Sequence, residues 1–327
     1  MKGEALLIDH ESTTDDKFSR DVLNGLNSTP KFLESKYFYD KNGDALFQQI
    51  MAMPEYYLTD CELDIFKHQT PWLAGAIQQN GTAFDLLELG PGNAQKSSYL
   101  LRYLVEERTD FTYMPIDISG NILNVLQHNL KEELPDLAIV ALEGDYLDML
   151  DQATSRSSRR KVVLFLGGNI GNMEPDEAAG FCAALRQKLA PGDLVLMGFD
   201  LKKNPATILN AYHDEAGVTA AFNLNLLLRM NNELGADFDI RQFQHYPTYD
   251  PLTGACKSYL ISQQKQVVRM GGKSILFMEN EPIYMEISQK FDPEGIDQLA
   301  LQSGFRPLLK FEDSKQWFVD VIWEVDG

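Results

Sequence analysis

"DLLELGPGNAQKSSYL", residues 85–100, decides the fold of this chain. Its apolar start predicts a buried strand, and that strand ends in an acid and two glycines, Gly90 and Gly92. The residues after the glycines have the apolar spacing of a helix. A buried strand that passes through a glycine turn into a helix is typical of an α/β fold with a parallel sheet.

The same alternation continues on the carboxyl side of this stretch. Further buried strands are expected at 111–119, 137–146, within 161–173 and at 192–201. Amphipathic helices are expected between them at 94–107, 120–134 and 175–190. Continuous apolar strands between such helices predict a doubly wound, Rossmann-like sheet that is covered on both faces.

The alternation of predicted strands and helices ends after Asp200. Residues 204–239 read as helical, and residues 244–278 alternate and carry turn signals, as antiparallel strands do. A helix at 292–305 and two strands within 306–325 complete the pattern. We therefore predict an inserted α+β domain, with 61–200 plus 289–327 as the core and 1–60 plus 201–288 as the substrate-binding domain.

The amino-terminal part of the chain predicts two helices. Residues 42–77 have helical spacing, and Pro54 is expected to stop the first helix. Thr59 or Asp60 is expected to cap the second helix.

Composition excludes several classes of function. The chain has 327 residues, of which 29 are basic and 48 acidic, so its formal charge is −19. Binding to nucleic acid or to an anionic membrane requires an excess of Lys and Arg, and neither partner is expected. No apolar run is long enough for a signal peptide or a membrane span, and we expect a cytoplasmic monomer.

The metal-ligating residue types are scattered. The three cysteines are far apart without CxxC spacing, and the five histidines form no cluster of ligands (Cys61, Cys182, Cys256; His10, His68, His128, His213, His245). We therefore expect reduced, buried thiols and no metal site.

Three ligands compete for the glycine turn. A dinucleotide fingerprint requires a third glycine, which is absent from "GPGNAQ", and a P-loop requires a glycine directly before Lys96. S-adenosylmethionine (SAM) needs close backbone contacts and nearby acids but no pyrophosphate cradle. Glu88 precedes the glycines, and Asp117 and Asp145 end the next two predicted strands. One such acid would be an ordinary helix cap, but acids at three successive strand ends favour SAM.

The longer motifs resemble the L-histidine Nα-methyltransferases of ergothioneine biosynthesis. The likeness is carried by "YFYDKNGDALFQQIMAMPEYYLT" (37–59), "FLGGNIGNMEPDEA" (165–178), "AYHDEAGVTAAFNLNLLLRMNNELGADFD" (211–239) and "YMEISQKF" (284–291), and it covers nearly the whole chain. It implies a SAM-dependent methyltransferase core and a second domain that closes over an amino acid. The implied reaction trimethylates histidine to hercynine.

Carried over position by position, the resemblance implies two sets of residues. The methyl donor would contact Gly90, Lys96, Asp117 and Asp145. The amino and carboxylate groups of the substrate would be held by Tyr56, Asn172 and Tyr212, with Tyr39 near the amine. Glu286 and Ser288 would face the imidazole, and Tyr39 and Tyr56 would be the catalytic residues.

Other interpretations of these residues stay open. A tyrosine pair is usually part of a core, and Asn172 could shape a turn. The chain could also methylate another amino acid, such as a tryptophan-type amine, because Ser258 stands where the resemblance leads us to expect a methionine. A SAM-binding protein without catalysis is a third alternative.

Overall fold

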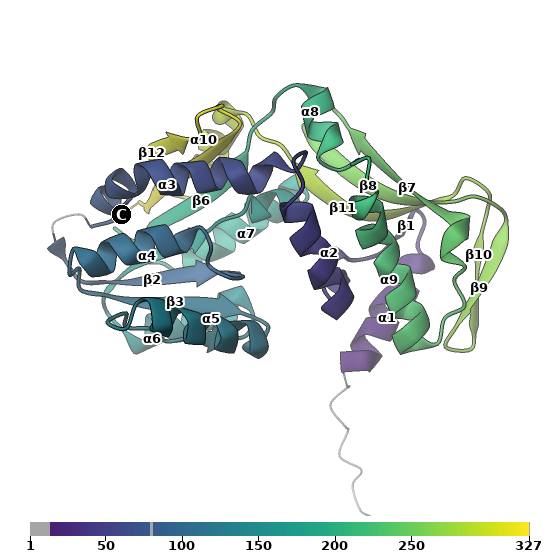
Figure 1. Cartoon of the computed structure of the whole chain (residues 1–327), viewed down its shortest axis with the longest axis horizontal. Coiled ribbons are helices and arrows are strands. Elements are labelled where there is room, and N and C mark those ends of the chain that lie inside the picture. The colour runs from purple at the N-terminus through teal and green to yellow at the C-terminus, as the bar shows by residue number, and fades with distance from the viewer. Residues whose placement is uncertain (1–13, 79–80, 327) are drawn as a thin grey trace, which may run out of the picture. The chain divides into compact units, whose positions relative to one another are not determined.

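The computed structural model describes residues 14–78 and 81–326 and divides into two compact units (Figure 1). Unit 1 comprises 1–56, 209–249 and 257–286, and unit 2 comprises 57–208, 250–256 and 287–327. The predicted second domain, 1–60 plus 201–288, differs from unit 1 at 57–60, 201–208, 250–256 and 287–288, which belong to unit 2. The division into a methyltransferase core and a substrate-binding domain stays a prediction.

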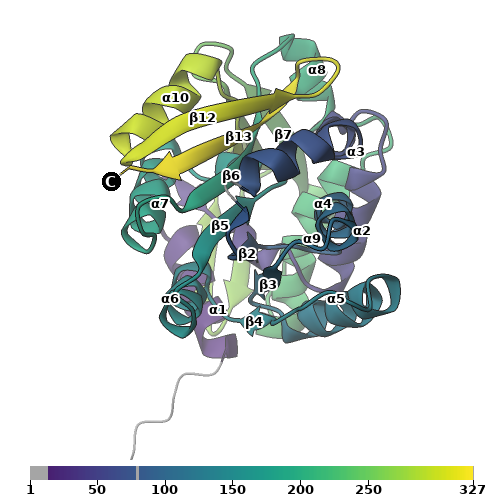
Figure 2. The ribbon, with the colours of Figure 1, turned by 90° about the vertical axis from the view of Figure 1, so that its left-hand side faces the viewer.

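Unit 2 is a doubly wound α/β unit, as the sequence predicts. Its seven-stranded sheet has the order β12-β13-β6-β5-β2-β3-β4, and the strands from β6 to β4 are parallel. Figure 2 shows α3, α4 and α5 on one face of this sheet and α6, α7 and α10 on the other. The elements are α3 (Tyr57–Ile77), β2 (Phe84–Leu89), α4 (Ser97–Glu106), β3 (Phe111–Asp117), α5 (Gly120–Glu133), β4 (Leu142–Glu143), α6 (Tyr146–Arg156), β5 (Arg160–Phe165), η3 (Asn169–Asn172), α7 (Pro175–Gln187), β6 (Leu194–Asp200), α10 (Pro293–Gln302), β12 (Phe305–Glu312) and β13 (Phe318–Val325).

The order of this sheet places a switch point beside β2. The chain runs from β2 outward through β3 to β4, and then returns to place β5 on the other side of β2. Ligands of open α/β sheets bind beyond the carboxyl ends of the strands at such a point. All six residues of β2 are buried, so this strand holds the glycine turn against the hydrophobic core.

Three local predictions need correction. The third strand, expected over 137–146, is only Leu142–Glu143 with an isolated bridge at Ile139, because the chain there leaves the edge of the sheet. The helix α6 was not predicted, since its sequence is largely polar. Helix α3 begins at Tyr57, so neither Thr59 nor Asp60 is its cap.

Unit 1 is the predicted α+β part. Its hydrophobic core is formed by α1, α2 and α9 together with a four-stranded sheet, β1-β11-β8-β7, and the hairpin β9-β10 (Figure 1). The connecting elements α8, β8 and β11 contain residues of both units. The elements are α1 (Thr14–Leu26), β1 (Lys31–Phe32), η1 (Ser35–Tyr37), α2 (Lys41–Met51), α8 (Pro205–Asn210), α9 (Val218–Leu234), η4 (Ile240–Gln242), β7 (Phe243–Tyr249), β8 (Ala255–Ser262), β9 (Gln266–Met270), β10 (Lys273–Phe277) and β11 (Pro282–Gln289).

Candidate active site

The glycine turn after β2 brings the chain back across the end of the sheet. Gly90 has a φ of +65° and donates its N–H to the carbonyl of Ile116, 2.9 Å away. A Cβ at Gly90 would lie 2.6 Å from the hydroxyl oxygen of Tyr146. Position 90 therefore requires glycine both for its backbone conformation and for the close approach of Tyr146.

Tyr146, the first residue of α6, lies near three of the predicted cofactor residues. Burial raises the pKa of Tyr146 to about 12, and the charges of Asp117 and Asp145 add to that shift. The phenol thus lies near Gly90 and both acids, which come from three different loops. The sequence pattern did not identify Tyr146, and cofactor binding by the two acids stays a prediction.

Asp117 and Asp145 have different local roles. Asp117 ends β3, and its Oδ1 accepts a hydrogen bond from the backbone N–H of Ser119 at 2.9 Å. Ser119, not Asp117, caps α5. Asp145 is an exposed helix cap, because its Oδ1 accepts from the N–H of Leu147 at 3.0 Å. Helix capping is therefore an actual role of Asp145 but not of Asp117.

Lys96 belongs to a buried group that we call the acid-rich cluster: Glu62, Lys96 and Asp320. Lys96 forms an ion pair with Glu62, a residue of α3 that is only 1% exposed. Glu62 also accepts from the backbone N–H of Gly167, at 2.8 and 2.9 Å. Burial and the charge of Glu62 raise the pKa of Asp320 well above its usual range. Glu62 thus joins Lys96 to the loop that follows β5.

Glu88 is a buried residue of β2 that lies just before the glycine turn. It is buried, and its Oε2 accepts from the hydroxyl of Tyr113 at 2.5 Å. Burial raises the pKa of Glu88 to about 7, while hydrogen bonds from Tyr113 and Ser97 oppose the shift. Its carboxyl group is therefore engaged within the core.

The chain segments that carry Asn172 and Ser288 meet in a close backbone contact within unit 2. Asn172 is the exposed last residue of η3. A Cβ on the preceding residue, Gly171, would lie 2.8 Å from the carbonyl oxygen of Gln289, which directly follows Ser288. Ser288 accepts a hydrogen bond from the ammonium of Lys290 at 2.7 Å.

Three predicted tyrosines lie in unit 1. The rings of Tyr56 and Tyr212 meet edge to face, with centroids 6.3 Å apart. The ring of Tyr39 is 45% exposed and packs edge to face against Phe47 and Phe222, at 5.6 and 5.8 Å. Tyr56 and Tyr212 are thus neighbours, whereas Tyr39 is anchored by phenylalanines of α2 and α9.

Glu286 lies on β11, where buried and half-buried residues alternate. It shares the half-buried face with Ser288, as their spacing predicts. Asn223 of α9 approaches Glu286, with 3.5 Å between Nδ2 and Oε1. The Oδ1 of Asn223 is buried and has no hydrogen-bond partner among the described residues. Asn223 is therefore a polar neighbour of the predicted imidazole site that the sequence pattern did not identify.

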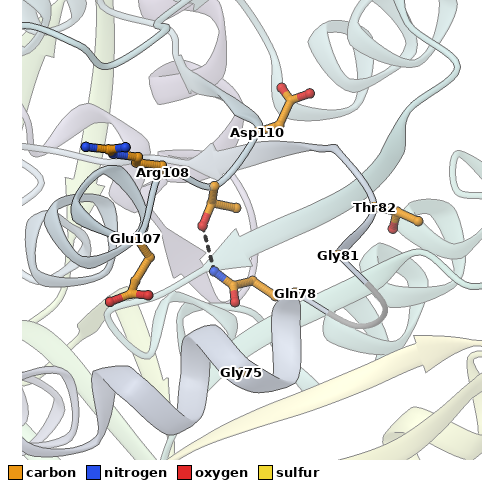
Figure 3. Close-up of a pocket in the computed structure, with 8 residues that line it drawn as sticks. Gly75, Gln78, Gly81, Thr82, Glu107, Arg108 and Asp110 are labelled. Carbon is orange, nitrogen blue, oxygen red and sulfur yellow. Dashed lines mark hydrogen bonds between the residues drawn. The ribbon is translucent and has the colours of Figure 1, made fainter.

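The described residues contain neither a cluster of metal ligands nor a membrane span. No group of three or more His, Cys, Asp and Glu side chains in 14–78 and 81–326 could hold a metal ion. No helix in that part is long and apolar enough to cross a membrane. A hollow near the amino ends of β2 and β3 is bridged by a 2.6 Å hydrogen bond from Gln78 to Thr109 (Figure 3). It contains none of the predicted site residues.

Comparison with known proteins decides the family. The family described as histidine-specific, SAM-dependent methyltransferases matches residues 18–325. The chain belongs to this family. The match extends through both compact units, which agrees with the resemblance found in the sequence.

Three relatives illustrate its range. The chain is 37% identical to the histidine N-alpha-methyltransferase of Mycobacterium tuberculosis, over 92% of this chain and 90% of that protein. It is 35% identical to the same enzyme of Mycolicibacterium smegmatis, over 88% of each. It is also 31% identical to a 4-dimethylallyltryptophan N-methyltransferase of Claviceps fusiformis, over 96% of this chain and 90% of that protein.

Several supporting residues escaped prediction for a common reason. Glu62, Tyr146, Asn223 and Asp320 act through partners that are distant in sequence. The one available signal was in α3, where Glu62 lies directly after Cys61 in an apolar stretch of the helix. A carboxylate at a core position has to be paired, and this identifies Glu62 as a residue with a specific partner.

Proposed function

We propose that the protein transfers methyl groups from SAM to the α-amino group of L-histidine and forms hercynine, a step toward ergothioneine. The observation that carries this proposal is the family match over residues 18–325. It is supported by the presence of the site residues that the resemblance implies, from Tyr39 to Ser288, while Ser258 departs from the expected methionine.

The residues of unit 2 fit SAM. We propose that the cofactor lies along the backbone of Gly90, where the close approach of Tyr146 leaves no space for a side chain. Asp117 would accept hydrogen bonds from the ribose hydroxyls, and Asp145 would bind the adenine amino group. Lys96, held by Glu62, would complete the cofactor site. When it is bound, SAM supplies a methyl group on a positively charged sulfur.

The remaining residues would position the amino acid. Tyr56, Asn172 and Tyr212 would hold its amino and carboxylate groups, while Glu286 and Ser288 would bind the imidazole. The amine must be neutral and in line with the methyl group, so orientation supplies much of the rate. Tyr39, or a water that it holds, would relay to solvent the proton that the amine loses. An apolar ring would leave Glu286 and Ser288 without partners, so these residues favour histidine.

A second candidate substrate is a tryptophan-type amine. Ser258 is smaller than the methionine expected at its position, and one relative acts on 4-dimethylallyltryptophan. Ser258 is buried, and its Oγ lies 3.3 Å from Nε2 of His245. Burial lowers the pKa of His245 to about 4, so His245 is neutral at pH 7. A neutral polar pair costs less to desolvate beside an apolar ring than a charged pair would.

Mass spectrometry of the products tests the assignment directly. The purified protein is incubated with SAM and L-histidine, with L-tryptophan and the other amino acids in parallel. We expect a gain of three methyl groups on histidine alone. Methylation of another amine would overturn the substrate assignment, and the absence of any product would favour a binding protein.

Glu286 variants sharpen this test. We expect Glu286→Ala to lower kcat/KM for histidine by roughly 10–100-fold, because a charge-assisted hydrogen bond to the imidazole is lost. Glu286→Gln keeps an acceptor oxygen and should lose less. Steady-state kinetics measures both variants. Equal losses with histidine and with a tryptophan-type amine would contradict the role of Glu286.

We also propose that the protein acts as a cytoplasmic monomer without metal, nucleic acid or membrane partners. The charge of −19 supports the absence of polyanionic partners. Light scattering after size-exclusion chromatography tests the oligomeric state. A mass of twice 37.0 kDa would overturn the monomer.

A further inference from the structure

Lys290, the residue that follows β11, is a fully buried lysine. Its side chain is 0% exposed, which is rare for lysine unless the ammonium is paired. The Nζ of Lys290 lies 2.8 Å from Oδ2 of Asp200 and 2.7 Å from Oγ of Ser288. Lys290 therefore connects the side chain of Ser288 to a buried carboxylate at the end of β6.

Asp200 is shared between two lysines, and we call Asp200, Lys203 and Lys290 the lysine-rich cluster. Lys203 forms an ion pair with Asp200, and the hydroxyl of Tyr57 donates to Oδ2 of Asp200 at 2.8 Å. Burial lowers the pKa of Lys203, and the charge of Lys290 adds to that effect. Lys290 is the member of this cluster that contacts Ser288, because the contacts of Lys203 are with Asp200, Tyr57 and Leu201.

The chemistry of this contact sets the direction of the hydrogen bond. An ammonium group has three donors and no acceptor, so Ser288 Oγ must accept from Lys290. The hydroxyl hydrogen of Ser288 then points to a different acceptor. A positive charge at 2.7 Å also strengthens the hydroxyl as a donor and repels a second N–H aimed at the same oxygen.

On the basis of the proposed function, we infer that Lys290 is a positioning residue that fixes Ser288 as a hydrogen-bond donor to the substrate. The imidazole nitrogen opposite Ser288 must then be without a hydrogen. The other nitrogen carries the N–H that Glu286 accepts. Lys290 thereby selects one tautomer of neutral histidine, since the two ring nitrogens have different roles.

A double-mutant cycle tests this inference. Lys290→Met removes the donor and leaves Asp200 with Lys203 and Tyr57 as partners. We expect KM for histidine to rise about tenfold with kcat changed less, because one well-placed hydrogen bond is lost. The dissociation constant of SAM, measured by titration calorimetry, should stay within twofold of wild type. In a Ser288→Ala background, Lys290→Met should have little further effect on KM.

Lys203→Met is the matched control. It removes the same buried charge from the same carboxylate but no contact with Ser288. We expect KM for histidine to remain within about twofold of wild type. The inference is overturned if Lys203→Met and Lys290→Met raise KM equally, or if the effects of Lys290→Met and Ser288→Ala add fully. A wild-type protein that leaves histidine unmethylated overturns the proposed function together with this inference.

Nitrogen NMR provides a test that needs no variant. L-histidine labelled with ¹⁵N in the ring is bound to the wild-type protein with S-adenosylhomocysteine. We expect one nitrogen to have the chemical shift of an N–H and the other that of a bare nitrogen. Averaged shifts from exchanging tautomers, or two N–H signals from an imidazolium, would overturn the role of Lys290.

Discussion

The two clusters of unit 2 differ in their ratio of carboxyl groups to lysines. The acid-rich cluster has two carboxyl groups for one lysine, Lys96, whereas the lysine-rich cluster has two lysines for one carboxylate, Asp200. In the first cluster, burial and repulsion by Glu62 raise the pKa of Asp320, which favours the neutral form of its carboxyl group. In the second, burial lowers the pKa of Lys203.

The two clusters should therefore respond differently to the loss of a carboxylate. If Glu62 loses its charge, Asp320 can ionise and compensate Lys96. If Asp200 loses its charge, the lysine-rich cluster holds no other acid that can replace it. Removal of a single buried partner is costly because the remaining charge is left without compensation.

The largest expected effect is that of Asp200→Asn. Two buried ammonium groups would lose their common partner, and we expect a loss of about 3–5 kcal/mol in the free energy of unfolding. Urea denaturation measures it. Asp292→Asn is the control, because Asp292 pairs with Lys202 at 3.0 Å but is 46% exposed, and such a pair contributes about 0–1 kcal/mol. Equal losses for the two variants would contradict the comparison.

Much of unit 2 could be predicted from local pattern, but neither cluster could. The apolar runs and glycines around Gly90 predict strands and turns because these signals act over a few residues. Residues 137–146 have the same apolar character, yet Val140 is 41% exposed, because tertiary contacts decide how much of an edge segment pairs. The residues next to Lys290 in sequence predict an exposed lysine. Its burial is possible because its ammonium pairs with Asp200, which lies 90 positions earlier in the chain.

Glu62→Gln should have a smaller effect than Asp200→Asn. The glutamine oxygen can still accept from Gly167, and Asp320 can ionise beside Lys96. We expect a loss of about 1–2 kcal/mol in the free energy of unfolding. The affinity for SAM should be about tenfold weaker, because the ion pair that holds Lys96 to Glu62 is lost. Denaturation and titration calorimetry measure the two effects. A loss as large as that of Asp200→Asn would show that Asp320 does not compensate.

Asp320→Asn should have the smallest effect at low pH, and its effect should grow as the pH rises. The pKa of Asp320 is raised in the folded protein, so the folded state holds a proton that the unfolded chain releases above pH 3.8. The wild-type protein therefore loses stability as the pH rises from 3.8 toward the folded pKa. Asparagine resembles the protonated acid and removes this loss. We expect the variant to be within about 1 kcal/mol of wild type at pH 5 and more stable than wild type at pH 8.

Urea denaturation at both pH values, with Glu62→Gln alongside, decides whether Asp320 is neutral. In Glu62→Gln the pKa of Asp320 should fall, because the repelling charge is gone, and the same Asp320→Asn change should then destabilise the protein at pH 8. A reversal of sign between the two backgrounds is specific to a carboxyl group that is protonated because of its neighbour. If Asp320→Asn instead destabilises the wild-type background equally at pH 5 and pH 8, Asp320 is ionised there, and the surplus of acid in this cluster is not stored as a neutral group.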